Sequence, residues 1–398
     1  MKYIKLFDKL SDFESVKYNL DRPNVSLIQE NNQVEYIAAS SIIEPAIDYS
    51  KEYFTIEALE DGLTAKLSAN ACEYCIDNGE WNTLAKATNT VSINKGQTLS
   101  FRGNLTPTSS NGIGTFTISK KCNVKGNIMS LLYKDDFTDK TDLTGKSYTF
   151  KNLFLNCSTI IDALYLVLPA TILINECYSN MFEGCTCLTV APELPATTLT
   201  EYCYYCMFLG CASLTQVHKL PATMLAESCY SSMFYGCTGL TVAPELPATT
   251  LTAWCYEYMF SGCTGLTVAP ELPATTLANS CYQYMFQGCT GLTVAPELPA
   301  TTLIYGCYEC MFEGCTGLTV APELSAITLA QSCYYGMFRD CSNLNYIKAL
   351  FTTTPSNLYT NKWVSGVSST GTFVKSKDAT WNVIGVSGIP KGWIVQTV

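Results

Sequence analysis

The sequence predicts an α+β protein with a small N-terminal β-sandwich-like domain, a repeat solenoid and a C-terminal β cap. The solenoid is predicted from a block of 26 residues that recurs without insertion, which places the dipeptide Met-Phe at Met181, Met207, Met233, Met259, Met285, Met311 and Met337. Self-similarity at a period of about 20–50 residues is typical of a solenoid, whose coils bury their apolar faces only by stacking. The β-sandwich is predicted from runs with period-2 alternation between residues 53 and 132.

The first 45 residues are predicted to be an N-terminal arm that gains order by docking on something else. They are mixed in charge and contain two strand-like runs, VSLIQ after Pro23 and a second near VEYIA. Residues 46–137 are predicted to be the β-sandwich-like domain. The runs FTIEAL, LTAKLSA, TVSIN, TLSFRG and GTFTIS alternate apolar and polar residues, and turns such as Asp77-Asn78-Gly79, in a predicted hairpin, separate them.

Residues 138–345 are predicted to be the solenoid, with one short strand, a proline-bounded turn and one short helix in each unit. Between Thr252 and Leu277, apolar residues at i, i+1, i+4, i+5 and i+8 predict the buried stripe of an α-helix, formed by Cys255, Tyr256, Met259, Phe260 and Cys263. Gly262 and Gly265 are expected to end this helix in left-handed conformations. Leu266-Thr267-Val268 predicts the strand, which Pro270 stops.

Atypical units flank the regular array and are expected to act as caps. The first, which includes Leu153–Cys157, is looser in sequence and is followed by a two-residue insertion. Residues 346–398 are predicted to be a C-terminal β cap, because TGTFVKSKDATWNVIGVSGIPKGWIVQTV predicts two or three strands with turns at glycine and proline. We expect this cap to cover the open edge of the last coil.

Charge and hydropathy argue against several classes of function. The formal net charge is −10, whereas nucleic-acid-binding proteins normally carry a basic stripe, so no nucleic-acid partner is expected. No run of about 18 apolar residues occurs, so no membrane insertion is expected. Lys5 and Asp8 interrupt the N-terminal segment, so no signal peptide is predicted and synthesis in a reducing cytosol is expected.

The 21 cysteines are predicted to be mostly buried free thiols, with some disulfides after oxidation as the alternative. Most occur as C-x7-C, such as Cys255/Cys263, rather than as the C-x2-C pairs of zinc sites, and Cys72/Cys75 is a lone C-x2-C pair. No metal or other cofactor is therefore expected. His218 is the only histidine, and residues 46–137 contain no paired carboxylates, nucleophile–base pair or phosphate loop, so no enzymatic activity is predicted.

Comparison of the units with one another locates a candidate binding surface. The strand and turn, LTVAPELPATTL, hardly change, whereas the outer face of the predicted helix varies and is rich in aromatic residues, namely Tyr202, Tyr205, Tyr235, Trp254, Tyr258, Tyr284, Tyr305 and Tyr335. Tyrosine and tryptophan give large contact areas at low entropic cost, so these residues are candidate ligand contacts. Drift at exposed positions that packing does not constrain is the alternative.

One glutamate per unit is expected to form an acidic ladder along the solenoid. The ladder consists of Glu193, Glu245, Glu271, Glu297 and Glu323, and Lys219 occupies the same position in the second unit. At a strand spacing of about 4.8 Å these carboxylates would repel one another unless they were solvated or bridged by a cation. We expect a solvated ladder rather than a calcium site, because no second carboxylate recurs beside the first.

The repeats resemble the BspA-type leucine-rich repeats of bacterial surface proteins over residues 153–345. The similarity is carried by Met259-Phe260-Ser261-Gly262-Cys263-Thr264-Gly265-Leu266 and Leu272-Pro273, although the 26-residue period is longer than usual and methionine replaces alanine. The opening MKYIKLFDKLSDFESVKYNLDRPNVSLI and the segment GNIMSLLYKDDF are similar to proteins of gut Bacteroides and their crAss-like phages. The first resemblance implies a leucine-rich-repeat solenoid with an extracellular adhesive or ligand-binding role.

These observations lead us to expect a non-enzymatic, fibre-type protein of a virion surface that binds a bacterial-surface or mucosal glycan or protein. The arm would then bind other virion proteins, and a homotrimer would suit a fibre. A bacterial cell-surface adhesin exported by an unusual route is the alternative. A purely structural spacer, and an enzyme with its site in the β domain, are further alternatives.

Overall fold

The computed structural model describes residues 3–4, 25–30, 33–39, 47–68, 72–84, 90–108 and 111–398. The chain divides into two compact units, Met1–Asp48 and Tyr49–Val398. In the first unit β2 (Val25–Glu30) and β1 (Tyr3–Ile4) pair antiparallel with the two edges of β3 (Gln33–Ala39). The two strands predicted for the N-terminal arm are thus confirmed, and the rest of that arm lies outside the described residues.

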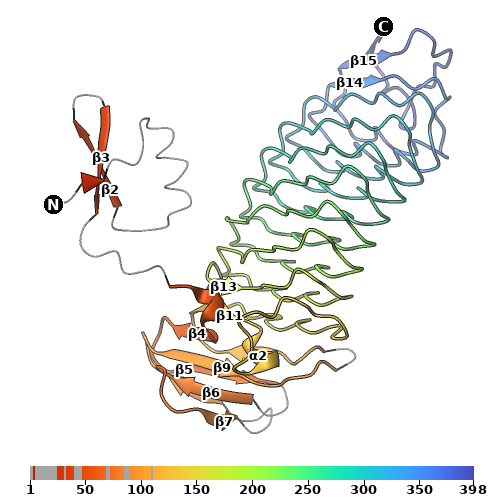
Figure 1. The fold of residues 1–398 in the computed structure, drawn as a ribbon. Coiled ribbons are helices and arrows are strands. Elements are labelled where there is room, and N and C mark those ends of the chain that lie inside the picture. The colour runs from red at the N-terminus through yellow and green to blue at the C-terminus, as the bar shows by residue number, and fades with distance from the viewer. Residues whose placement is uncertain are drawn as a thin grey trace. The chain divides into compact units, whose positions relative to one another are not determined.

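The second unit begins with η1 (Tyr49–Lys51) and a β domain of two sheets (Figure 1). Its strands are β4 (Phe54–Ala58), β5 (Leu63–Leu67), β6 (Cys72–Ile76), β7 (Asn82–Leu84), β8 (Val91–Ile93), β9 (Thr98–Arg102), β10 (Phe116–Ile118) and β11 (Cys122–Asn127). β10-β5-β8 form one sheet, and β11-β4-β9-β6-β7 belong to the other. Phe54 and Phe101 of the larger sheet pack on Phe116 of the smaller, with ring centroids 5.3 and 5.1 Å apart.

The alternating runs of the sequence therefore form strands as predicted, and the hairpin between β6 and β7 is confirmed. Asp77 and Asn78 have φ of 50° and 57°, and the Gly79 N–H donates to the Ile76 carbonyl at 2.9 Å. Two consecutive left-handed residues define a type I′ turn, whose twist matches that of the flanking strands.

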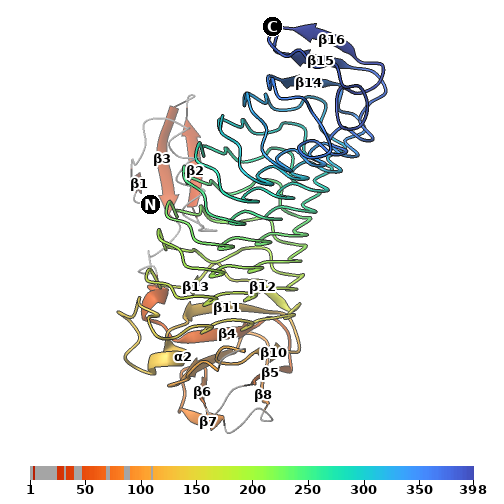
Figure 2. The same cartoon turned by 90° about the vertical axis from the view of Figure 1, so that its right-hand side faces the viewer.

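β11 connects the β domain to the solenoid by continuous hydrogen bonding. It pairs in parallel with β12 (Ile160–Asp162) and β13 (Leu166–Val167), which lie in the first coils (Figure 2). The short helix α2 (Ser130–Tyr133) follows β11 and returns the chain towards these coils. The N-terminal end of the stack is therefore covered by the β domain.

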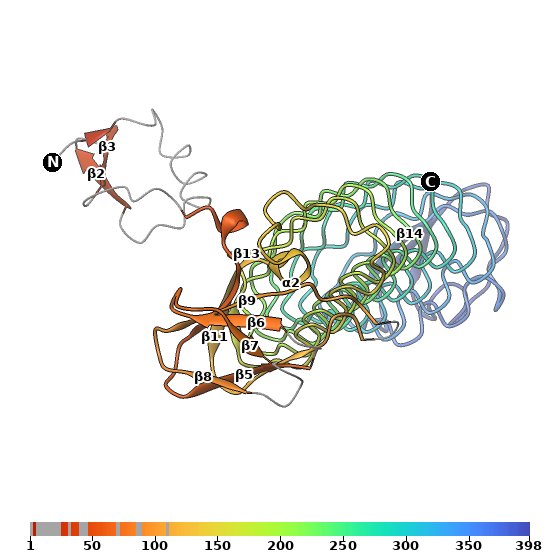
Figure 3. The same cartoon turned by 60° about the horizontal axis from the view of Figure 1, so that its bottom comes forward.

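The helix predicted for each unit is wrong, because residues 138–345 contain runs of turns in its place (Figure 3). We call each run, such as 226–237, a turn segment. Its N–H groups alternate between two kinds of acceptor: Tyr230 and Ser232 donate to carbonyls 25 residues on, in the next coil, whereas Met233 donates to the Tyr230 carbonyl in its own coil. An α-helix would use its N–H groups internally and could not join neighbouring coils in this way.

Every fourth residue of a turn segment has a left-handed backbone. Ser228, Ser232 and Gly236 have φ of 50°, 57° and 71°. The two residues after each of the two serines are buried, which gives the apolar side chains a period of four residues. Over two turns this period resembles the 3.6 residues of an α-helix, and this is why the pattern predicts a helix.

The outcome differs at the other two predicted features of the unit. Gly262 is left-handed as expected, with φ of 73°, but Gly265 is glycine for a different reason, because a Cβ there would lie 2.5 Å from the Thr238 carbonyl oxygen. The predicted strand at residues 266–268 is wrong, since only isolated parallel bridges form there, between Val242 and Val268 and between Val268 and Val294.

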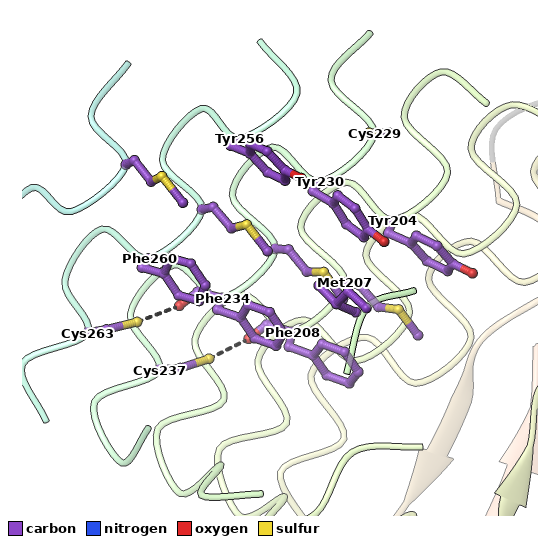
Figure 4. Close-up of a cluster of buried hydrophobic side chains, with 14 of the residues drawn as sticks. Tyr204, Met207, Phe208, Cys229, Tyr230, Phe234, Cys237, Tyr256, Phe260 and Cys263 are labelled. Carbon is purple, nitrogen blue, oxygen red and sulfur yellow. Dashed lines mark hydrogen bonds between the residues drawn. The ribbon is translucent and has the colours of Figure 1, made fainter. Parts of the chain in front are cut away.

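The solenoid interior consists of columns of identical side chains (Figure 4). Phenylalanine rings from Phe182 to Phe338 stack with centroids 5.5–5.8 Å apart, and tyrosine rings from Tyr178 to Tyr334 stack at 5.7–6.0 Å. Each aromatic side chain thus finds the same neighbour in the next coil. Aromatic pairs contribute about 0.5–1.5 kcal/mol beyond the area that they bury, so the columns reinforce the stack.

The cysteines are free thiols, and all but Cys187 are buried, as the sequence predicts. One column has a specific partner: the Cys263 thiol donates to the Phe234 carbonyl of the preceding coil at 3.1 Å, and the same contact recurs along the stack (Figure 4). Cysteine is small enough for this position and supplies a donor that alanine lacks.

The C-terminal segment extends the stack by a small parallel sheet made of β14 (Tyr346–Ala349), β15 (Thr372–Lys375) and β16 (Ile394–Thr397). A bridge between Val320 and Tyr346 joins it to the regular coils. Trp363 continues the phenylalanine column, 6.2 Å from Phe338, and its indole N–H donates to the Gly388 carbonyl at 2.9 Å. Large aromatic side chains therefore close the interior at this end.

A thiol reagent tests this arrangement. In the folded protein, Cys187 should react first and most other thiols should be protected, because burial excludes the reagent and raises the pKa of thiols such as Cys281 to about 12. All 21 cysteines should react once the protein is unfolded without reductant. If fewer than 21 thiols react after unfolding, disulfides have formed, contrary to the structure.

Substitution of His218 tests whether the second coil has the same backbone as the others. His218 occupies a position where other coils have a buried proline such as Pro244 or Pro270. A recess opens beside it, lined in part by Pro192 and Phe208. We expect His218→Pro to raise the free energy of unfolding by about 0.5–1 kcal/mol, chiefly by restricting the unfolded chain. Chemical denaturation measures the change, and a decrease would show that the second coil has a backbone unlike the others.

Candidate ligand-binding surface

The candidate residues lie on the outward side of the turn segments, which we call the turn face. Four of them are at left-handed positions, with φ of 54° at Tyr202, 53° at Trp254 and Tyr258, and 56° at Tyr284. A bulky residue in this conformation costs about 1–2 kcal/mol. Ser228 and other small residues at equivalent positions are left-handed too, so the coil imposes the conformation and a ligand is not needed to explain it.

The structure brings three of the candidates into one cluster. The rings of Tyr258 and Tyr284 are parallel within 4°, with centroids 4.5 Å apart, and Tyr235 lies 6.3 Å from Tyr258. We call these three residues the tyrosine patch. Tyr202 and Tyr205 form a separate edge-to-face pair at 5.7 Å.

The remaining three candidates stand apart from these clusters. Trp254, Tyr305 and Tyr335 make no ring–ring contact within residues 111–398. Trp254 and Tyr305 are 37% and 48% exposed. They add apolar surface to the turn face without joining the tyrosine patch.

The tyrosine hydroxyls of the patch are hydrogen-bonding groups that stay protonated. Burial, followed by the charge of Glu257, raises the pKa of Tyr258. Burial and the neighbouring Cys310 thiol raise the pKa of Tyr284, whose hydroxyl also contacts that thiol. Both rings therefore offer a neutral phenol to a ligand at physiological pH.

Two glutamates beside the patch were not among the sequence candidates. Glu257 and Glu309 lie in one outward column, two coils apart, with the neutral Gln283 between them. Both are half-buried, and burial raises the pKa of each carboxyl. Their polar partners are neutral: the Ser231 hydroxyl lies 3.3 Å from the Glu257 carboxylate, and Gln283 bonds to Glu309.

The distribution of charged residues along the sequence could have identified these glutamates as candidates. Between Lys219 and Arg339 the chain has eight glutamates and no lysine, arginine, histidine or aspartate. Within residues 111–398, only Glu313 and Glu323 of the eight form salt bridges, with Arg339 and Lys348. The middle of the solenoid therefore carries negative charge that no cation of residues 111–398 compensates, apart from Arg339 and Lys348 at its end.

The glutamates of the predicted acidic ladder lie on another face and are exposed. Two of them have basic neighbours, with His218 Nδ1 at 3.6 Å from Glu193 and Lys348 at 2.8 Å from Glu323. Among the described residues, no group of three or more histidine, cysteine, aspartate or glutamate side chains is arranged to hold a metal ion. Exposure leaves these carboxylates hydrated, unlike Glu257 and Glu309.

The β domain carries a charged cluster of a different kind, in which the acidic and basic groups are paired with each other. Glu73 accepts hydrogen bonds from Arg102 and Lys134, at 2.6 and 2.8 Å, and these bonds lower its pKa. Asp135 contacts Arg102 and the Tyr53 hydroxyl. The cluster fastens the segment after β11 to the sheet, and neither carboxylate has the raised pKa of a general acid.

Comparisons with known proteins add no relative: no protein-family model matches the sequence, and no curated protein matches it significantly. The helices in the described part of the chain are all too short or too polar to cross a membrane. Function is therefore inferred from the geometry of the turn face.

The half-buried glutamates predict a specific pH dependence of stability. Because burial raises both pKa values above those of the unfolded chain, the folded state binds more protons in that pH window, and its stability falls as the pH rises through it. Glu257→Gln/Glu309→Gln should therefore melt about 1–3 °C higher than the wild type at pH 7 and equally at about pH 3. Differential scanning calorimetry at both pH values measures this.

Glu227 of the same face provides the control, because its carboxylate is exposed. Glu227→Gln therefore changes the net charge but removes no half-buried charge. An equal gain for Glu227→Gln would attribute the effect to net charge rather than to burial.

Proposed function

We propose that this chain is a non-enzymatic, fibre-type protein of a phage virion surface whose turn face binds a host-cell or mucosal ligand. One observation carries the proposal: the buried side chains repeat from coil to coil, whereas the outward side chains of the turn segments differ and include the tyrosine patch. A varied aromatic surface on a stacked scaffold is typical of specific recognition. The ligand in this proposal is a glycan or a protein.

The virion location is supported by the similarity of the opening sequence and of GNIMSLLYKDDF to proteins of gut Bacteroides and their crAss-like phages. In this arrangement the N-terminal arm binds other virion proteins and the solenoid is exposed. A bacterial cell-surface adhesin is the second candidate, favoured by the BspA-type resemblance of the repeats. Mass spectrometry of purified virions and the position of the gene relative to capsid genes separate the two.

The chain itself supplies conservative variants for testing the turn face. Serine occupies the positions equivalent to Trp254, Tyr258 and Tyr284 in other coils, for example Ser228 and Ser232, with the same left-handed backbone. Trp254→Ser/Tyr258→Ser/Tyr284→Ser should therefore fold normally and lose at least about tenfold in affinity for the ligand. Binding of purified protein to intact gut bacteria and to a glycan array measures the loss.

Val268→Thr, on a different exposed face, is the matched control and should bind as the wild type does. Equal binding by the triple variant would move recognition to the β domain or the C-terminal sheet. Failure of the wild type to bind any cell or glycan would favour a structural role in a particle.

A further inference from the structure

We propose that the tyrosine patch and its two flanking glutamates bind lysine or arginine side chains of a basic polypeptide segment. This inference rests on the proposed recognition role of the turn face and names the chemistry of its ligand. The feature that carries it is an aromatic cluster bordered by half-buried carboxylates that form no salt bridge within the described residues 111–398.

The two glutamates beside the tyrosine patch are charged groups with neutral partners. Glu257 and Glu309 have lost part of their hydration, and their partners Ser231 and Gln283 are neutral. Glu313, in a nearby column, shows what the chain does when it supplies a cation, because Arg339 Nε donates to it at 2.8 Å. A ligand cation at Glu257 or Glu309 would give that carboxylate the charged hydrogen bond that Arg339 gives Glu313.

The stacked tyrosines lie beside these glutamates. Glu257 directly precedes Tyr258, and the Tyr284 N–H donates to the Glu309 carbonyl at 2.9 Å, so each glutamate adjoins one tyrosine of the stacked pair. Aromatic rings attract lysine and arginine cations, with about 0.5–2 kcal/mol per contact. The apolar stems of these side chains would pack on tyrosine while their charged ends reach a carboxylate.

A polypeptide is the source of cations that best fits the turn face. Glutamates that form no salt bridge with the described part of the chain recur along the turn face from Glu227 through Glu257 to Glu309, over several coils of the stack. A chain with several basic side chains matches this extended row, whereas a single small cation would use only one position. Complementary charge of this kind speeds association and selects the partner.

Labelled hexalysine is the probe for the first experiment, titrated against the full chain at about 0.15 M salt to screen long-range attraction. Glu257→Gln/Glu309→Gln should weaken binding at least about tenfold, because it removes partly desolvated charges in the site. Gln283 shows that glutamine fits this column. Glu271→Gln/Glu297→Gln, with the same change in net charge on another face, should weaken binding by about twofold or less.

Equal losses for the two pairs would overturn the proposal, because they would show attraction to net charge alone. Tyr258→Ser/Tyr284→Ser separates the aromatic contribution and should also weaken binding, with the charge unchanged. Hexalysine acetylated on its side chains should not bind. A chitosan oligosaccharide that binds in a Glu257-dependent manner, while hexalysine does not, would show that the cation comes from an amino sugar and that the polypeptide assignment is wrong.

These outcomes are distinct from failure of the proposed recognition role. If wild-type protein binds bacteria or glycans through the aromatic residues but ignores hexalysine, the ligand class is wrong and recognition stands. If hexalysine binds at the patch but no cell or mucosal surface does, the chemistry stands and the biological role is wrong.

Discussion

Hydrogen bonding between successive coils is the constraint on which the rest of the structure depends. In each turn segment of the regular array half of the N–H groups donate to carbonyls 25 residues on, and the others close turns within the coil. One residue inserted within a turn segment would exchange the two kinds of donor that follow it, so these segments keep their length. The two-residue insertion after the first unit lies between turn segments, and there the Phe150 N–H still donates to the next coil, at the Cys177 carbonyl 27 residues on. The same alternation sets the four-residue period, which sends cysteine, tyrosine, methionine and phenylalanine inward.

Because each coil has the same backbone, each buried side chain meets a copy of itself, and a substitution must suit two neighbours that are not substituted. This explains why Phe, Tyr and the hydrogen-bonding Cys hardly vary, and why the interior needs no disulfides. The outward positions have no such requirement. Even the left-handed conformation at Trp254 and Tyr258 is imposed by the hydrogen bonds between coils. These many bonds offset the conformational cost of about 1–2 kcal/mol at each bulky residue.

The sequence predicts the period, the β strands before residue 120, the hairpin turn at Asp77–Asn78 and the buried thiols, because each depends on a local or periodic pattern. It does not separate a helix from a turn segment, since two turns of either give almost the same apolar pattern. Asn156 and Asn180, at left-handed positions, are the available signal. Glu257 and Glu309 were missed because their significance depends on partial burial, which a repeated glutamate does not reveal.

Two exposed faces of the solenoid could contact a partner, and they differ in the information that they carry. Val242, Val268, Val294 and Val320 are 50–71% exposed and present the same side chain in four successive coils. A face of this kind offers any ligand several equivalent positions, so it cannot fix a register. The turn face has one stacked tyrosine pair and one pair of half-buried glutamates, and therefore a single best position. Specific binding requires that difference in free energy between positions, which favours the turn face as the recognition surface.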